Sequence, residues 1–140
     1  MPRYLVVAHQ TADSPELAQT LADVTRREPG STFVLVVPAT APEHGGTWTE
    51  GETQRLAAAA GERARSFLRL HGVELAAVRV GDRNPINAAG DEWNDHPEYD
   101  GVILSTLPVG VSRWLRMDAY NQLVKRMTIP VRHVVAQPRS

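Results

Sequence analysis

The feature that most constrains this chain is the alternation of short apolar runs with segments of helical periodicity. We expect strands at five apolar runs, which cover residues 4–8, 33–37, 75–80, 102–105 and 131–135. Helical patterns lie between them, over 15–27, about 51–71, 84–95 and from just after Ser112 to about 127. Because parallel neighbours need crossover connections, this order predicts a five-stranded parallel sheet with helices on both faces.

Helix boundary signals support this division. Ser14 is the expected N-cap of the first helix, with Pro15 at its first position. Gly72 is expected to end the second helix in a left-handed conformation, and Asn84-Pro85 to begin the third.

The distribution of charge among the strands predicts their order in the sheet. The first, second and fourth runs are almost wholly apolar, as in central strands that are covered on both sides. The third run carries Arg79, and the fifth carries Arg132 and His133, which is typical of edge strands. We therefore expect a three-layer, doubly wound α/β fold with strand order 3-2-1-4-5. Ligands of such sheets bind where the winding reverses, at the carboxyl ends of strands one and four.

Composition narrows the function classes. The chain has 140 residues, no cysteine and a formal net charge of -1. We expect one domain over residues 1–140, without disulfides or thiol catalysis, and no nucleic-acid partner. The apolar run at the N-terminus is too short for a signal peptide or a membrane span, so we expect a cytoplasmic protein without membrane contact.

Several stretches resemble the universal stress protein (UspA-like) family, nearly along the whole chain. Residues 4–9 followed by Ser14-Pro15 resemble its first strand and helix start, and 80–85 resemble its Gly-Asp turn. Residues 99–106 resemble the strand before its nucleotide loop, and 129–135 its closing Pro-Val strand. The stretch 105–118 is similar to a divergent bacterial branch. The resemblance implies an adenine nucleotide alpha hydrolase-like fold, a role in the stress response and a homodimer formed through the last strand.

The resemblance also directs attention to the segment after strand four. ATP-binding members carry Gly-x2-Gly-x9-Gly-Ser/Thr there, and these positions fall on Ser105, Pro108, Asp118 and Ala119. None of the three glycines is present. The resemblance thus implies a small-molecule ligand and names no certain cofactor, with ATP, AMP or another nucleotide as the candidates.

The predicted crevice supplies the candidate ligand-binding residues. Gly110 would let backbone N–H groups approach a phosphate, and Arg113 and Arg116 would clamp an anion by bidentate hydrogen bonds. The full candidate set is Ala8, His9, Gln10, Ser105, Thr106, Gly110, Ser112, Arg113 and Arg116. Plainer roles stay open, with Ser112 as a helix cap, His9 as a structural histidine and Trp114 as a core side chain.

No catalytic residue and no metal site is predicted. The cluster of Asp91, Glu92, Asp95 and His96 has no recognised metal spacing and is expected to form a solvated helix face. The first hypothesis is therefore a non-catalytic, ligand-binding regulatory domain. The second is a ligand-free, dimeric interaction module, whose crevice Trp114 or Leu107 would plug. The third is a nucleotide-ester hydrolase, which would need His9 within hydrogen-bond reach of Ser105 or Thr106.

Overall fold

The chain folds around one five-stranded parallel sheet. The computed structural model describes residues 1–41, 47–108, 114 and 118–137. The strands are β1 (Arg3–Val7), β2 (Thr32–Pro38), β3 (Ala77–Gly81), β4 (Gly101–Thr106) and β5 (Val131–Val135). Their order in the sheet is β3-β2-β1-β4-β5, with every neighbouring pair parallel. The order expected from strand charge is confirmed.

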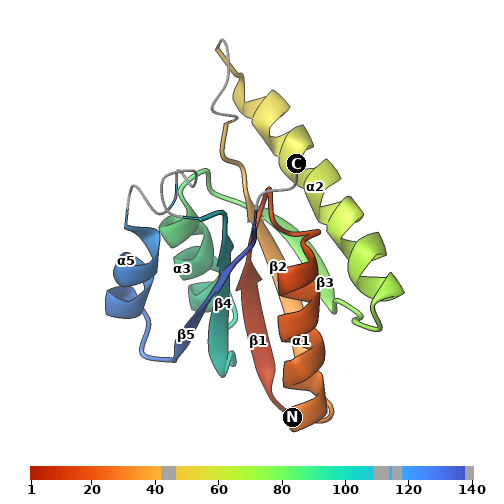
Figure 1. Cartoon of the computed structure of the whole chain (residues 1–140). Helices are drawn as coiled ribbons and strands as arrows, with labels where there is room; N and C mark the ends of the chain where they lie inside the picture. Colours follow the sequence, from red (N-terminus) through yellow and green to blue (C-terminus); the bar gives the residue numbers. More distant parts are fainter. Residues whose placement is uncertain (42–46, 109–113, 115–117, 138–140) are drawn as a thin grey trace.

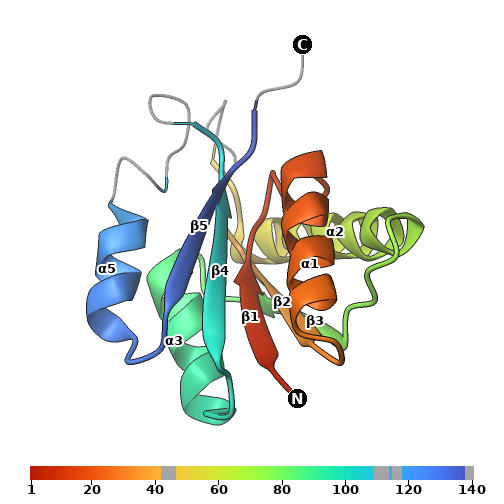
Figure 2. The same ribbon diagram turned by 60° about the horizontal axis from the view of Figure 1, so that its bottom comes forward.

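Helices cover both faces of the sheet. They are α1 (Pro15–Arg27), α2 (Glu50–Leu70), α3 (Pro85–Asp95) and α5 (Ala119–Arg126). Figures 1 and 2 show α1 and α2 on one face and α3 and α5 on the other, so that the molecule has three layers. None of the described helices is long and apolar enough to cross a membrane.

Local capping interactions explain where the helices begin and end. The Ser14 hydroxyl accepts the N–H of Leu17 at 3.1 Å, as predicted for an N-cap. Asn84 caps α3 in the same way, since its side-chain oxygen accepts the N–H of Ile86 at 2.8 Å. After α2, Gly72 has φ +79°, the left-handed conformation that favours glycine.

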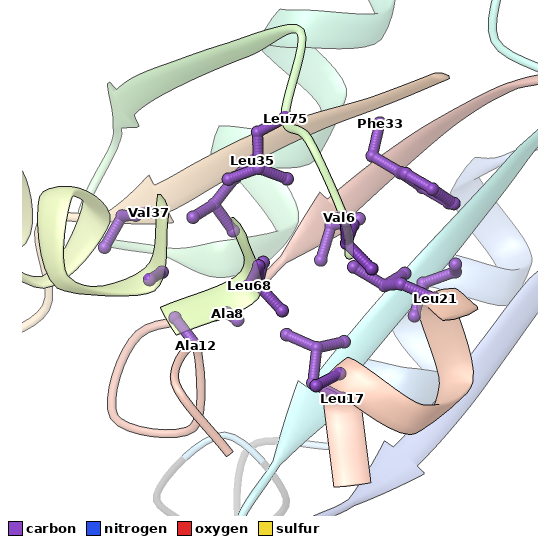
Figure 3. Packing of buried hydrophobic residues seen from close by; sticks show 14 of the residues in the cluster. Val6, Ala8, Ala12, Leu17, Leu21, Phe33, Leu35, Val37, Leu68 and Leu75 are labelled. Atoms are coloured by element: carbon purple, nitrogen blue, oxygen red, sulfur yellow. The ribbon is translucent and has the colours of Figure 1, made fainter. Parts of the chain in front are cut away.

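Two apolar cores lie on the two sides of the sheet. One core joins α1 and α2 to the sheet, and Figure 3 shows Leu17 and Leu21 of α1 directed toward Val6 and Phe33 of the strands. The other core joins α3 and α5 to the opposite side chains of the same strands. The central strands are buried on both faces because consecutive side chains alternate between the two cores.

Two expectations for local structure need correction. The third strand was expected over 75–80 but is Ala77–Gly81, because Leu75 packs into the core ahead of the strand. The acidic cluster on α3 is not wholly solvated, because Glu92 is only 7% exposed. Its carboxylate pairs with Arg79 at 3.1 Å and accepts the Tyr99 hydroxyl at 2.7 Å. The described residues contain no metal-binding cluster of histidine and acidic side chains.

Candidate functional site

The winding of the sheet reverses between β1 and β4, as the sequence predicts. β1 and β4 are hydrogen-bonded neighbours in the middle of the sheet, with Val7 opposite Leu104. β1 leads to α1 and β2 leads to α2 on one face of the sheet, whereas β4 leads toward α5 on the other. The residues that follow these strands therefore gather at one edge of the sheet, where ligands of this architecture bind.

A buried hydroxyl pair joins the ends of β1 and β4. The side-chain oxygens of Thr11 and Ser105 are 2.6 Å apart, and the two residues are 4% and 1% exposed. Thr11 lies in a tight turn, since its C=O accepts the N–H of Ser14 at 3.0 Å. A buried hydroxyl needs a hydrogen-bond partner, and each of these supplies the other. The pair forms a polar floor between the two strands.

The other hydroxyl at the end of β4, that of Thr106, hydrogen-bonds to a residue of β5. The Thr106 hydroxyl donates to the C=O of Leu107 at 2.8 Å. It then accepts from Nε2–H of His133, 2.7 Å away, because its only proton is already used. His133 also stacks on Tyr120, with ring centroids 5.4 Å apart. Burial lowers the pKa of His133 below its ordinary value of 6.5, which favours the neutral ring.

His9 has a polar atom that the protein leaves without a partner. The residue follows β1, and its C=O accepts the N–H of Ala12 at 3.2 Å. Its Nε2 is buried and finds no hydrogen-bond partner among the described residues. Burial, and then the positive charge of Arg63, lower the pKa of His9. A neutral imidazole with an unsatisfied ring nitrogen therefore lies at the end of the central strand.

Trp114 reaches across the same edge of the sheet to the segment after β2. The residue is 7% exposed and belongs to the core on the α3 and α5 side, as its plainer reading predicted. Its indole N–H donates to the Thr40 hydroxyl at 3.3 Å. Thr40 in turn donates to the C=O of Arg83 at 2.9 Å, in the turn between β3 and α3. This chain of hydrogen bonds links the segments that follow β4, β2 and β3.

The predicted site residues divide into three groups. His9, Ser105 and Thr106 lie together at the carboxyl ends of β1 and β4, with Gln10 exposed beside them. Ala8 is fully buried in the core, and its N–H donates to the C=O of Val36 at 3.3 Å. The remaining candidates lie outside the described residues: Gly110, Ser112, Arg113 and Arg116.

Sequence reasoning missed two residues of this site. Thr11 and Thr40 supply hydroxyls at the same edge as the predicted set. Both follow apolar strands by a few residues, and a search for hydroxyls after every central strand would have found them. Their partners, however, come from 94 and 74 residues further along the chain, and sequence proximity does not indicate them.

The geometry bears directly on the hydrolase hypothesis. That hypothesis needs the His9 imidazole within hydrogen-bond reach of Ser105 or Thr106. Those two hydroxyls are bonded instead to Thr11 and to His133, and both residues are at most 2% exposed. A nucleophile must be accessible and paired with a base. Ser105 bonds to a hydroxyl and not to a base, and Thr106, although it contacts the imidazole of His133, is buried, so neither hydroxyl forms the accessible pair with His9 that the hypothesis needs.

Comparison with known proteins connects this architecture to one fold family. No family model matches the chain, and no curated protein matches its sequence. Among solved structures, a universal stress protein from Archaeoglobus fulgidus in complex with dAMP is similar, with 19% identity over 96% of this chain and 97% of that chain and a TM-score of 0.63. A universal stress protein in complex with cAMP has 12% identity over 95% and 96% of the two chains, with a TM-score of 0.62. A universal stress protein family protein from Arabidopsis thaliana with AMP bound has 14% identity over 97% and 92%, with a TM-score of 0.58.

The doubly wound sheet, whose winding reverses between β1 and β4, defines a three-layer α/β fold of the adenine nucleotide alpha hydrolase-like kind. Within that class the chain has the universal stress protein fold, along nearly its entire length. The resemblance noted in the sequence is confirmed at the level of the fold.

Proposed function

We propose that this chain is a non-catalytic regulatory domain that binds a small, nucleotide-like ligand at the carboxyl ends of β1 and β4. The observation that carries the proposal is the buried Nε2 of His9, which has no partner among the described residues. Leaving a buried polar atom unsatisfied costs about 1–3 kcal/mol, so a polar ligand group that pairs with it gains that much. Structural neighbours that hold dAMP, cAMP and AMP support a nucleotide as the ligand.

The electrostatics near His9 favour a ligand with negative charge or with polar oxygens. Arg63 contributes positive potential at this imidazole, which is one reason that the pKa of His9 is lowered. A neutral ring donates from Nε2–H to a phosphate or ribose oxygen without adding charge. We infer that His9 orients the ligand and that Arg63 assists by its field.

Isothermal titration of the full chain with AMP, dAMP, cAMP and ATP tests this proposal. We expect heat of binding with at least one nucleotide, and about tenfold weaker affinity in His9→Ala, as for the loss of one buried hydrogen bond. His71→Ala is the matched control, because that imidazole lies exposed at the end of α2. Absence of heat with all four nucleotides would contradict the proposal.

A second function, a ligand-free interaction module, is favoured by one specific observation. The Trp114 indole spans from the segment after β4 to Thr40 after β2, and it is buried there. We infer for this second function that the indole takes the place that the base of a ligand would otherwise occupy. If the native chain shows no heat with any nucleotide and Trp114→Ala does, the crevice is filled by the protein itself and the second function holds.

A further inference from the structure

A groove of about 800 Å³ lies between α2 and α3 at β3, the strand at one end of the sheet, and none of its lining residues belongs to β1 or β4. Val80 and Gly81 of β3 form its floor. Arg55 of α2 stands on one side, and Asp91 and Asp95 of α3 stand on the other. Figure 1 shows β3 at the end of the sheet, with α2 and α3 on its two faces.

The floor of this groove is a free strand edge. Within the part of the chain that the structure describes, β3 pairs with β2 and with no other strand. The C=O of Gly81 accepts the N–H of Ala39 at 3.2 Å and so points toward the β2 side. Because successive residues of a strand direct their backbone groups to opposite sides, the N–H and C=O groups of Val78 and Val80 point outward. Such groups form hydrogen bonds with an added strand.

The usual protection of an edge strand is weak here. Arg79 is the one charged residue of β3, and charged side chains normally deter pairing at an edge. Its guanidinium forms an ion pair with the carboxylate of Glu92, 3.1 Å away, and the Arg79 side chain is 42% exposed. The neighbouring Val80 is 39% exposed. An apolar residue with free backbone groups thus faces the groove.

The walls of the groove carry net negative charge. Once the pair of Arg79 and Glu92 is set aside, the lining has three carboxylates, those of Asp82, Asp91 and Asp95, and one guanidinium, that of Arg55. Asp91 and Asp95 are exposed, one helical turn apart on the same side of α3. The groove is therefore complementary to positive charge and repels polyanions such as nucleic acid.

We propose that this groove binds an extended basic peptide segment of a partner protein, which adds to the edge of β3 as a further strand. Main-chain hydrogen bonds to Val78 and Val80 hold the peptide. Lysine or arginine side chains of the peptide reach Asp91 and Asp95, and its small apolar side chains contact Val80. This recognition mode is strand addition with specificity from charge.

Fluorescence anisotropy with labelled peptides tests the proposal on the full chain at low ionic strength. The probe is a capped hexapeptide of alternating lysine and valine. One control replaces each lysine with glutamate, and another carries N-methyl groups on alternate peptide bonds. We expect binding of the first peptide only, weakened by added salt. Equal binding of the N-methylated peptide would overturn strand addition, and absence of binding by the lysine peptide would overturn the proposal.

Variants of the protein separate the two parts of the proposal. Val80→Pro removes an outward N–H that β2 does not use, whereas Val80→Thr keeps it. We expect about tenfold weaker binding in Val80→Pro and little change in Val80→Thr. Asp91→Asn and Asp95→Asn should each weaken binding about two- to fivefold, as for exposed charge pairs, and Glu62→Gln on the outer side of α2 should not. Circular dichroism verifies that each variant is folded.

Two other occupants of the groove, a small polycation and a second copy of this chain, would give results that differ from those expected for a peptide. If spermine displaces the lysine peptide and Val80→Pro leaves peptide affinity unchanged, the groove attracts cations alone, which overturns the proposal. If sedimentation shows that Val80→Pro dissociates an oligomer of the native chain, the groove takes a second copy, which also overturns it. Nucleotide titration of Val80→Pro keeps this test separate from the function proposed at His9.

Discussion

The indole nitrogen of Trp114 lies 3.3 Å from the hydroxyl oxygen of Thr40, so that a residue following β4 is joined to one following β2 across the end of β1. The Thr40 hydroxyl also donates a hydrogen bond of 2.9 Å to the C=O of Arg83. One hydroxyl thus accepts one bond and donates another, and the edge that holds the proposed ligand site is tied together by it.

Removing that hydroxyl should loosen this edge. We expect Thr40→Val to lower the free energy of unfolding by about 1 kcal/mol, because it leaves the Trp114 N–H and the Arg83 C=O without their partner. Thr40→Ser keeps the hydroxyl and should retain most of the stability. Urea unfolding of the two variants checks this, and a Thr40→Val variant as stable as the native chain would show that the hydroxyl does not matter.

Truncating Trp114 should cost more, since its side chain packs in the core on the α3 and α5 side. We expect Trp114→Ala to destabilise the protein by about 3 kcal/mol, the usual cost of removing a large buried aromatic side chain. Differential scanning calorimetry measures the change. A variant as stable as the native chain would contradict the burial of this residue.

The hydroxyls of Thr11 and Ser105 should behave as a coupled pair. They are 2.6 Å apart and almost fully buried, so each single change leaves the other hydroxyl unsatisfied. We expect Thr11→Val and Ser105→Ala each to cost about 1–3 kcal/mol, and the double variant clearly less than the sum. A double-mutant cycle from urea unfolding measures the coupling. Additive effects would indicate that the two hydroxyls do not bond to each other.

Stability should fall as the pH is lowered through the histidine range. Burial lowers the pKa of His133 in the folded protein below its ordinary value of 6.5, so the unfolded chain binds the proton more readily. The contribution of this residue is therefore complete above the unfolded pKa and is lost as the pH falls from there toward the lowered native pKa. His9 acts in the same direction, because its pKa is also lowered.

Unfolding at about pH 7.5 and about pH 5.5 measures this dependence, a range that stays above most carboxyl titrations. His133→Gln keeps a donor for Thr106 but does not titrate, so it should reduce the loss of stability at the lower pH. His71→Gln, at the end of α2, is the control. An undiminished pH dependence in the combined His9→Gln and His133→Gln variant would refute the assignment.

Two glycines of α2 should respond in opposite ways to alanine. A Cβ at Gly61 would lie 2.5 Å from Cγ1 of Val78, whereas at Gly51 its nearest neighbour is a flexible arginine nitrogen at 3.8 Å. We expect Gly61→Ala to destabilise by about 1–3 kcal/mol through overpacking against β3. Gly51→Ala should be neutral or stabilising by up to about 1 kcal/mol, because alanine favours the helix. Thermal unfolding of both variants checks the difference in sign.

Much of this architecture is determined by local sequence pattern. Apolar runs that alternate with amphipathic segments specify parallel strands and crossover helices, and Ser14 and Asn84 begin their helices where short-range capping rules predict. The order of the strands in the sheet could also be predicted from the sequence, because Arg79 and Arg132 are tolerated only where a strand has a free side. These features depend on residues a few positions apart or on burial preference alone, so they can be read without coordinates.

The partners within the site were decided by the tertiary structure. Ser105 and Thr106 were predicted to lie at the ligand site, but nothing in the sequence indicates that their hydroxyls hydrogen-bond to Thr11 and to His133. Glu92 was expected in solvent, but folding buries it between Arg79 and Tyr99. Each of these contacts joins residues on different elements, and hydrogen bonding depends on distances and directions that only the packed sheet establishes.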